Sequence, residues 1–208
     1  GAVQGLLARM YLNAEVYTST PRYTDCITYC NKIIGAGYSL EPEYAKLFNA
    51  DNDKRTNEII FPLAVDSRYT VSWGATTYIV CGLVGDNDST QNPADYGVTS
   101  GWGMFRVRGE LPAKFGYTEG TTSVADKRAM FHTDGQSMMF SSSIDDKKNG
   151  YFATKWSNLK DDGTQASNTA SYGVDTDFPM FRLADVYLML AESVVRGGTG
   201  ATASEALG

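Results

Sequence analysis

LARMYL at residues 7–12 returns near the other end of the chain as LADVYL at residues 183–188. Both copies read Leu-Ala-x-x-Tyr-Leu, and both are soon followed by Ala-Glu. In each copy the apolar residues recur at a spacing near 3.6, the pattern of an amphipathic helix. The repeated phrase therefore predicts two copies of one helical unit, separated by a long segment of different character.

The first copy predicts a helical hairpin over residues 1–35. The apolar stripe of its first helix consists of Leu6, Leu7, Met10, Tyr11, Ala14 and Tyr17. After TSTP at 18–21 a second helix follows, with Thr20 as its cap, Pro21 at its first position and Gly35 as a left-handed end. The inner stripe of that helix consists of Tyr23, Ile27, Cys30 and Ile34. Two helices joined in this way form a hairpin of the tetratricopeptide kind.

The second copy predicts a helix over Phe181–Arg196 that ends at Gly197 and Gly198. Its inward side chains are Leu183, Val186, Tyr187, Leu190 and Val194. TGATASEAL at 199–207 then begins another helix, with Ser204 as its cap. Hairpins of this type stack on copies of themselves, because one hairpin cannot bury its own apolar face. Residues 181–208 are therefore the start of a further hairpin.

The segment between the copies, residues 36–180, is predicted to be a large, loop-rich insertion. It holds a short helix at 41–48 and a helical turn at 111–115. Its short strands are predicted at 57–66, 76–84 and 150–156. The fold class is mainly α: tetratricopeptide-like hairpins with an irregular insertion. Insertions in such arrays often form the binding face.

Composition excludes several classes of function. The 18 Lys and Arg residues are scattered among 24 Asp and Glu, without the basic stripe of a nucleic-acid-binding protein. No stretch approaches the run of about 18 apolar residues that a membrane span needs. The three cysteines, Cys26, Cys30 and Cys81, contain no C-x-x-C and predict neither a disulfide framework nor a zinc site. Both ends read as cuts within helices, so we expect an internal piece of a longer protein.

Signatures of catalysis are absent from the sequence. The single histidine, His132, has no partner motif, and neither a G-x-S-x-G elbow nor a phosphate-binding glycine loop occurs. Many pairs of carboxylates could be named, so no pair supports a glycosidase. GDND at 85–88 resembles part of a calcium loop, but an ordinary Asx-rich turn is favoured. We therefore expect no enzyme activity and no cofactor.

The insertion is rich in aromatic and amide side chains. Trp102 lies between two glycines at 101–103, and the other members of the group are Trp73, Tyr78, Asn92, Asp95 and Tyr96. A pyranose ring has an apolar face that stacks on an open indole, whereas amides and carboxylates bond its hydroxyls. The alternative is that Trp102 packs against the core, and composition alone favours that alternative.

Several phrases resemble the SusD/RagB family of outer-membrane lipoproteins of Bacteroidota, especially its starch-utilisation branch. They include PRYTDCITYCNKII at 21–34, NEIIFPLAVD at 57–66, GWGMFRVRGELPAKF at 101–115 and DTDFPMFRLADVYLMLAESVVRGGTGA at 175–201. The resemblance implies a tetratricopeptide-like protein at the cell surface, with a lipid anchor that lies outside this chain. It also implies a non-catalytic protein that binds an oligosaccharide, by preference a starch-type α-glucan, and passes it to a SusC-like TonB-dependent transporter.

The resemblance implies an arc of aromatic side chains that follows the curve of the glucan. In this chain we expect Trp102 to be its main platform, followed by Tyr78 and Trp73, and then Tyr96. Asn92, Asp95 and Arg106 are the polar candidates. A structural calcium ion is compatible with such relatives, but its ligands are unknown. The competing hypothesis is a helical-repeat scaffold that binds proteins and no glycan.

Overall fold

The computed structural model describes residues 1–86, 89–140, 143–166, 173–202 and 204. The chain divides into two compact units. Unit 1 consists of Gly1–Pro42, Arg55–Leu63 and Pro179–Gly208, and unit 2 consists of Glu43–Lys54 and Ala64–Phe178. In the described part of the chain, no helix is long and apolar enough to cross a membrane.

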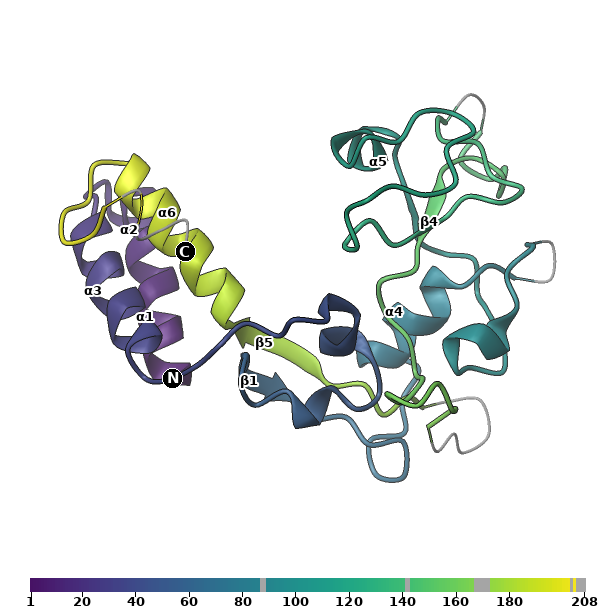
Figure 1. The fold of residues 1–208 in the computed structure, drawn as a ribbon, viewed down its shortest axis with the longest axis horizontal. Coiled ribbons are helices and arrows are strands. Elements are labelled where there is room, and N and C mark those ends of the chain that lie inside the picture. The colour runs from purple at the N-terminus through teal and green to yellow at the C-terminus, as the bar shows by residue number, and fades with distance from the viewer. Residues whose placement is uncertain (87–88, 141–142, 167–172, 203, 205–208) are drawn as a thin grey trace. The chain divides into compact units, whose positions relative to one another are not determined.

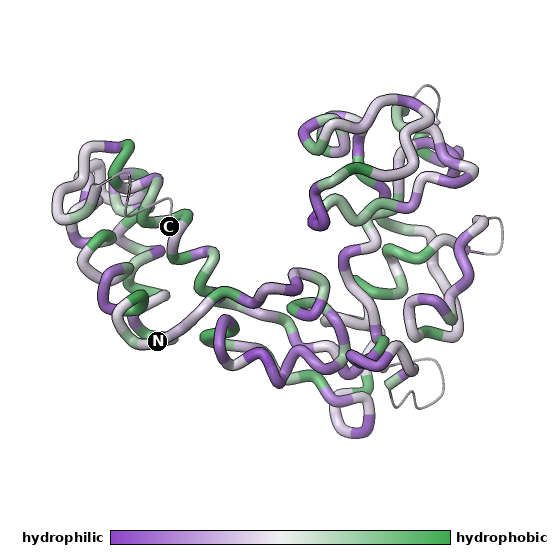
Figure 2. Tube along the Cα trace, viewed as in Figure 1, coloured by the Kyte–Doolittle hydropathy of each residue, from purple (hydrophilic) through white to green (hydrophobic). Residues whose placement is uncertain are grey.

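Unit 1 is built on the helices α1 (Ala2–Leu12), α3 (Tyr23–Ile34) and α6 (Leu183–Val195), with a short α2 (Ala14–Thr18). The three longer helices lie side by side in Figure 1 and share one core. Hydrophobic and hydrophilic residues alternate along them, as Figure 2 shows. The buried members of the core are Ala8, Cys26, Ile27, Cys30, Ile33, Leu183, Val186, Met189 and Leu190. The two copies of the repeated phrase therefore contribute to the same hydrophobic core, and the mainly α fold is confirmed.

The predicted inner face of the first helix is partly wrong. Gly5 and Ala8 are its buried residues, whereas Leu6, Met10 and Tyr17 are exposed. Small residues face the neighbouring elements because the backbone comes close there. A Cβ added to Gly5 would lie only 3.3 Å from the ring of Phe181. A search for large apolar residues therefore misses the small residues of the packed face, although Tyr11 of the predicted stripe does pack against the core.

The predicted boundaries of two helices also change. Thr20 does not cap α3, because its hydroxyl donates to the carbonyl of Thr18 (3.5 Å), and the helix begins at Tyr23. Gly35 continues the right-handed turn with φ −72°, and its N–H donates to the carbonyl of Asn31 (2.9 Å). The predicted helix from Phe181 begins at Leu183, because Phe181 belongs to a strand.

Ser204, the predicted cap of a further helix, is itself helical in the structure. Residues 203 and 205–208 of that predicted helix lie outside the described residues.

A two-stranded sheet precedes α6. It pairs β1 (Ile59–Leu63) with β5 (Phe178–Arg182), so the strand predicted at 57–66 is confirmed. The buried Glu58 carboxylate accepts a hydrogen bond from Arg182 at 2.8 Å, and the Glu58 carbonyl accepts one from the N–H of Leu183 at 3.0 Å. These bonds join the start of β1 to the start of α6.

Unit 2 combines short elements with long loops. Its helices are η1 (Tyr44–Phe48), η2 (Asn52–Lys54), α4 (Ala75–Leu83), η3 (Pro93–Tyr96) and α5 (Glu110–Lys114). Its antiparallel sheet has the order β2-β4-β3, with the strands β2 (Arg106–Val107), β4 (Tyr151–Ala153) and β3 (Phe131–His132). The predicted short helix within 41–48, the turn near 111–115 and the strand within 150–156 are confirmed by η1, α5 and β4.

The strand predicted at 76–84 is wrong, because this segment forms α4. Its Thr, Ile and Val residues favour strands by intrinsic propensity. The burial of Thr76, Thr77, Val80 and Cys81 nevertheless follows a helical spacing, and Val80, Cys81 and Val84 form a core with Val98 and Val174. Tertiary packing therefore overrides the local preference.

Candidate functional site

Helix α4 provides the frame of the candidate site. Gly74 is its N-cap residue, so Trp73 immediately precedes the helix, and Tyr78 lies on its first turns. Val80 and Cys81 are buried in the core of unit 2, whereas Tyr78 is 40% exposed. The helix thus fixes Tyr78 at the surface by anchoring its opposite face.

The glycine-flanked segment around Trp102 binds the end of α4 through its backbone. The last carbonyls of a helix lack partners within the helix. Here the N–H of Trp102 donates to the carbonyl of Cys81 (2.9 Å), and the N–H of Gly103 donates to that of Val84 (2.8 Å). Gly103 has a φ of +60°, and a Cβ on Gly101 would come within 2.0 Å of the carbonyl oxygen of Gly85. The close approach therefore depends on the missing side chain of Gly101, and the left-handed conformation at residue 103 favours glycine.

The docked segment brings three rings together: Trp73, Tyr78 and Trp102, which we call the aromatic cluster. The Trp73 and Trp102 rings have centroids 5.8 Å apart and planes inclined by 36°. The Tyr78 and Trp102 rings are 6.2 Å apart and inclined by 58°. Trp73 is 60% exposed, and Trp102 is half-buried, with one part packed on the core around Val80. The Trp102 ring is thus partly packed and partly open, and its role as a platform for sugar stays a prediction.

The amide and acid candidates form a local turn. Asn92 precedes η3, accepts a hydrogen bond from the N–H of Ala94 (3.2 Å) and donates one to Asp95 (3.3 Å). Tyr96 is half-buried against the same core as Trp102, and burial raises the pKa of its hydroxyl. Asp95 and Tyr96 line a cavity of about 430 Å³ together with Lys155. Trp102 is not among its lining residues.

Arg106 serves as a support for a loop. Its guanidinium donates to the backbone carbonyls of Ile144 (2.7 Å), Asn149 (2.9 Å) and Asp146. These bonds stabilise the turn at 144–149. The Nη1 and Nη2 donors of Arg106 are thus directed at the backbone, and its guanidinium lies over the ring of Phe140.

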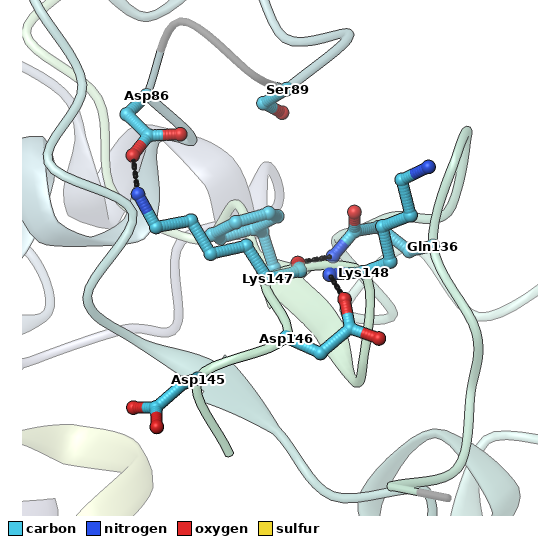
Figure 3. A pocket seen from close by; sticks show the side chains of 8 residues that line it. Asp86, Ser89, Gln136, Asp145, Asp146, Lys147 and Lys148 are labelled. Carbon is cyan, nitrogen blue, oxygen red and sulfur yellow. Dashed lines mark hydrogen bonds and ion pairs between the residues drawn. The ribbon is translucent and has the colours of Figure 1, made fainter. Parts of the chain in front are cut away.

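A polar pocket of about 500 Å³ lies beside this turn (Figure 3). It is lined by Asp86, Ser89, Gln136, Asp145, Asp146, Lys147, Lys148 and Phe152. The ammonium of Lys147 pairs with the carboxylate of Asp86, and Gln136 donates to the carbonyls of Lys147 (2.9 Å) and Gly150 (2.8 Å). Sequence reasoning missed this pocket, because Asp86 and Lys147 are 61 residues apart.

The histidine and two of the cysteines make contacts within the fold, outside the aromatic cluster. His132 Nε2 lies 2.8 Å from the hydroxyl of Thr90, and burial lowers the pKa of the imidazole. Cys26 and Cys30 share a buried face of α3, with their sulfur atoms 3.9 Å apart. Among the residues that the structure describes, no group of three or more His, Cys, Asp or Glu side chains could hold a metal ion. Half of the GDND segment, residues 87–88, lies outside the described residues, so the Asx-rich turn that is favoured there stays a prediction.

A helical core joined to a loop-rich part is the architecture of a known class of protein. Residues 5–208 match the model of the SusD family, and the chain belongs to that family. It is 32% identical over 239 residues to the starch-binding protein SusD of Bacteroides thetaiotaomicron, an alignment that covers 95% of this chain and 42% of that protein. The chain thus spans less than half the length of this relative.

Solved structures of other proteins share the fold of this chain. A SusD superfamily protein from Parabacteroides distasonis matches with a TM-score of 0.66 and 19% identity, over 99% of this chain and 42% of its own. Surface glycan-binding protein A from Bacteroides thetaiotaomicron, in complex with laminarihexaose, matches with a TM-score of 0.63 and 18% identity, over 99% of this chain and 45% of its own. At these identities the likeness shows a shared fold.

Proposed function

We propose that this chain contributes the aromatic cluster of a non-catalytic glycan-binding protein. The observation that carries the proposal is the convergence of Trp73 and Tyr78 on Trp102, with ring centroids 5.8 and 6.2 Å from that of Trp102 and all three rings partly open to water. An open aromatic surface that is held by backbone hydrogen bonds suits a ligand with flat apolar faces. Oligosaccharides have such faces, formed by the C–H groups of each pyranose ring.

The inclined rings fit successive sugar units better than one flat ligand. The planes of Trp73 and Tyr78 are inclined to that of Trp102 by 36° and 58°, so adjacent sugar units would stack on differently oriented surfaces. Each hydrogen bond to a hydroxyl contributes only about 0.5–1.5 kcal/mol net, because water competes for the same groups. Together with stacking this gives affinities in the micromolar to millimolar range. Weak binding allows a receptor to release its ligand.

The favoured ligand is a starch-type α-glucan. The support for this choice is the 32% identity to a starch-binding protein, and the laminarihexaose complex of a more distant relative makes a β-glucan the natural comparison. As in the branch that the chain resembles, we place the protein at the outer-membrane surface, held by a lipid anchor outside this chain. There it would deliver its glycan to a SusC-like TonB-dependent transporter.

Isothermal titration of the 208-residue chain with maltoheptaose tests the proposal, with laminarihexaose as the comparison ligand. We expect saturable binding of maltoheptaose, weaker binding of laminarihexaose, and no release of reducing sugar on prolonged incubation. Saturable binding of laminarihexaose alone would replace the α-glucan by a β-glucan. A folded chain that binds neither would contradict glycan binding and favour the protein-interaction scaffold.

A further inference from the structure

Gly82 is an unusual residue for its position in α4. It lies within the last turn of a helix and is buried, and its φ is not in the left-handed region that favours glycine. Glycine weakens a helix relative to alanine, so a buried helical glycine needs another explanation. The packing of a neighbouring side chain against Gly82 provides this explanation.

Phe105 occupies the space where a side chain of residue 82 would be. A Cβ on Gly82 would lie 2.5 Å from both Cδ2 and Cε2 of the Phe105 ring, whereas carbon atoms in contact are about 3.5–4.0 Å apart. The carbonyl of Gly82 also accepts the N–H groups of Met104 (2.9 Å) and Phe105 (2.8 Å). Both the ring and the backbone of the docked segment thus meet α4 at this residue.

From Phe105 the contact continues to the aromatic cluster. The Phe105 ring packs edge-to-face on Tyr78, with centroids 4.9 Å apart and planes at 74°. Tyr78 in turn faces Trp102. Phe105 therefore supports the Tyr78 ring through this contact. Because Gly82 has no side chain, the Phe105 ring can pack directly against α4.

We propose that Gly82 and Phe105 are positioning residues for the glycan site, with Gly82 acting through the Phe105 ring to set the orientation of Tyr78 and Trp102. Neither residue needs to touch the glycan. The functional part of this inference depends on the proposed glycan binding, but the positioning of the rings can be measured without a ligand.

A double-mutant cycle in the 208-residue chain separates this role from a general structural one. Gly82→Ala should displace the Phe105 ring by about 1 Å, from 2.5 Å to ordinary contact, and should weaken maltoheptaose binding at least fivefold. Phe105→Ala removes both atoms that the new Cβ would meet. In the Phe105→Ala background we therefore expect Gly82→Ala to change the affinity by less than twofold.

A spectroscopic signal reports the rings directly. Two indoles with centroids 5.8 Å apart couple their transitions and give a paired band in circular dichroism. Gly82→Ala should reduce this band, and in the Phe105→Ala background it should leave the band as it is. Gly5→Ala, another substitution of a buried helical glycine, is the matched control, because Gly5 lies in α1 of unit 1. It should change neither the band nor the affinity.

The outcomes distinguish this inference from the proposed function. An unchanged band and affinity in Gly82→Ala, or an equal loss in both backgrounds, would overturn the positioning role. If the unmodified chain binds no glycan, the proposed function fails. The effect of Gly82→Ala on the circular dichroism band, with and without Phe105→Ala, then tests the positioning role by itself. If Gly82→Ala does not fold, the double variant decides: folding with the properties of Phe105→Ala supports the contact, and failure to fold overturns it.

Discussion

The two units of this chain use their glycines and aromatic residues differently. In unit 1, helices α1, α3 and α6 share a largely aliphatic core, and Gly5 leaves room for the ring of Phe181. In unit 2, the glycines around Trp102 and at Gly82 let a loop bind a helix end, and the rings next to them remain partly exposed. Both units have hydrophobic cores, but in unit 2 close packing next to glycines also leaves an aromatic surface partly open.

If this contrast is right, a core substitution in unit 1 should change stability and leave glycan affinity alone. Leu190 is buried among the helices of unit 1, so Leu190→Ala should lower the free energy of unfolding by about 2–5 kcal/mol. Urea unfolding measures this loss, and titration with maltoheptaose below the transition should give the affinity of the unmodified chain. A large loss of affinity in the folded variant would show that the contrast is wrong.

The next largest effect is expected in unit 2. Trp102→Ala removes the ring that contacts both other members of the aromatic cluster, and maltoheptaose affinity should fall at least tenfold, or about 1.4 kcal/mol. Trp156→Ala is the matched control, because Trp156 packs on the same core as Trp102 but is not a member of the aromatic cluster. Its ring stacks on that of Phe178, with centroids 5.7 Å apart. Titration calorimetry of both variants should show the loss of affinity in the first only. Equal losses would mean that stability, and not stacking, determines binding.

A smaller effect is expected from Trp73. This ring contacts Trp102 and is 60% exposed, so Trp73→Ala should weaken binding about three- to tenfold with little change in stability. Tyr69→Ala serves as the control, because Tyr69 is exposed nearby in the sequence and packs with Arg68. Tryptophan fluorescence during glycan titration measures both. A stronger effect from Tyr69 than from Trp73 would place the ligand elsewhere on this loop.

The smallest effect concerns pH. Burial raises the pKa of Asp177 above its ordinary 3.8, although its carboxylate accepts the N–H of Val65 at 2.8 Å. A raised pKa in the folded state favours the protonated form, so this contribution to stability is fully present below pH 3.8 and is lost as the pH rises through the folded pKa. Asp177→Asn keeps an acceptor oxygen and removes the titration. Its stability relative to the unmodified chain, measured by urea unfolding, should rise from acid to neutral pH, and a flat difference would contradict the assignment.

Local sequence patterns predict the helices and strands of this protein whose formation depends on neighbouring residues. The periodicity of LADVYL predicts α6 because a regular apolar face is visible in the sequence. The same patterns wrongly predict a strand at 76–84, because residues such as Thr77 and Val80 have strand propensity whereas their packing is helical. Gly82 gives no local signal either, since the residue that needs its missing side chain is Phe105.

At the candidate site, too, contacts between residues that are distant in the sequence could not be predicted. Residue type groups Trp73, Tyr78 and Trp102, and the structure brings these rings together. Proximity in the sequence adds Arg106 to the group, whereas its Nη donors bind the turn at 144–149, which is distant in sequence. Side-chain chemistry can be read from a sequence, but the partner of each donor depends on the tertiary fold.

The most direct test of the central claim is a crystal structure of the chain with bound maltoheptaose. We predict consecutive glucose units stacked on Trp102 and on at least one of Trp73 and Tyr78, with the sugar C–H faces in contact with the rings. A glycan bound with high occupancy elsewhere, with these three rings free of sugar, would contradict the account.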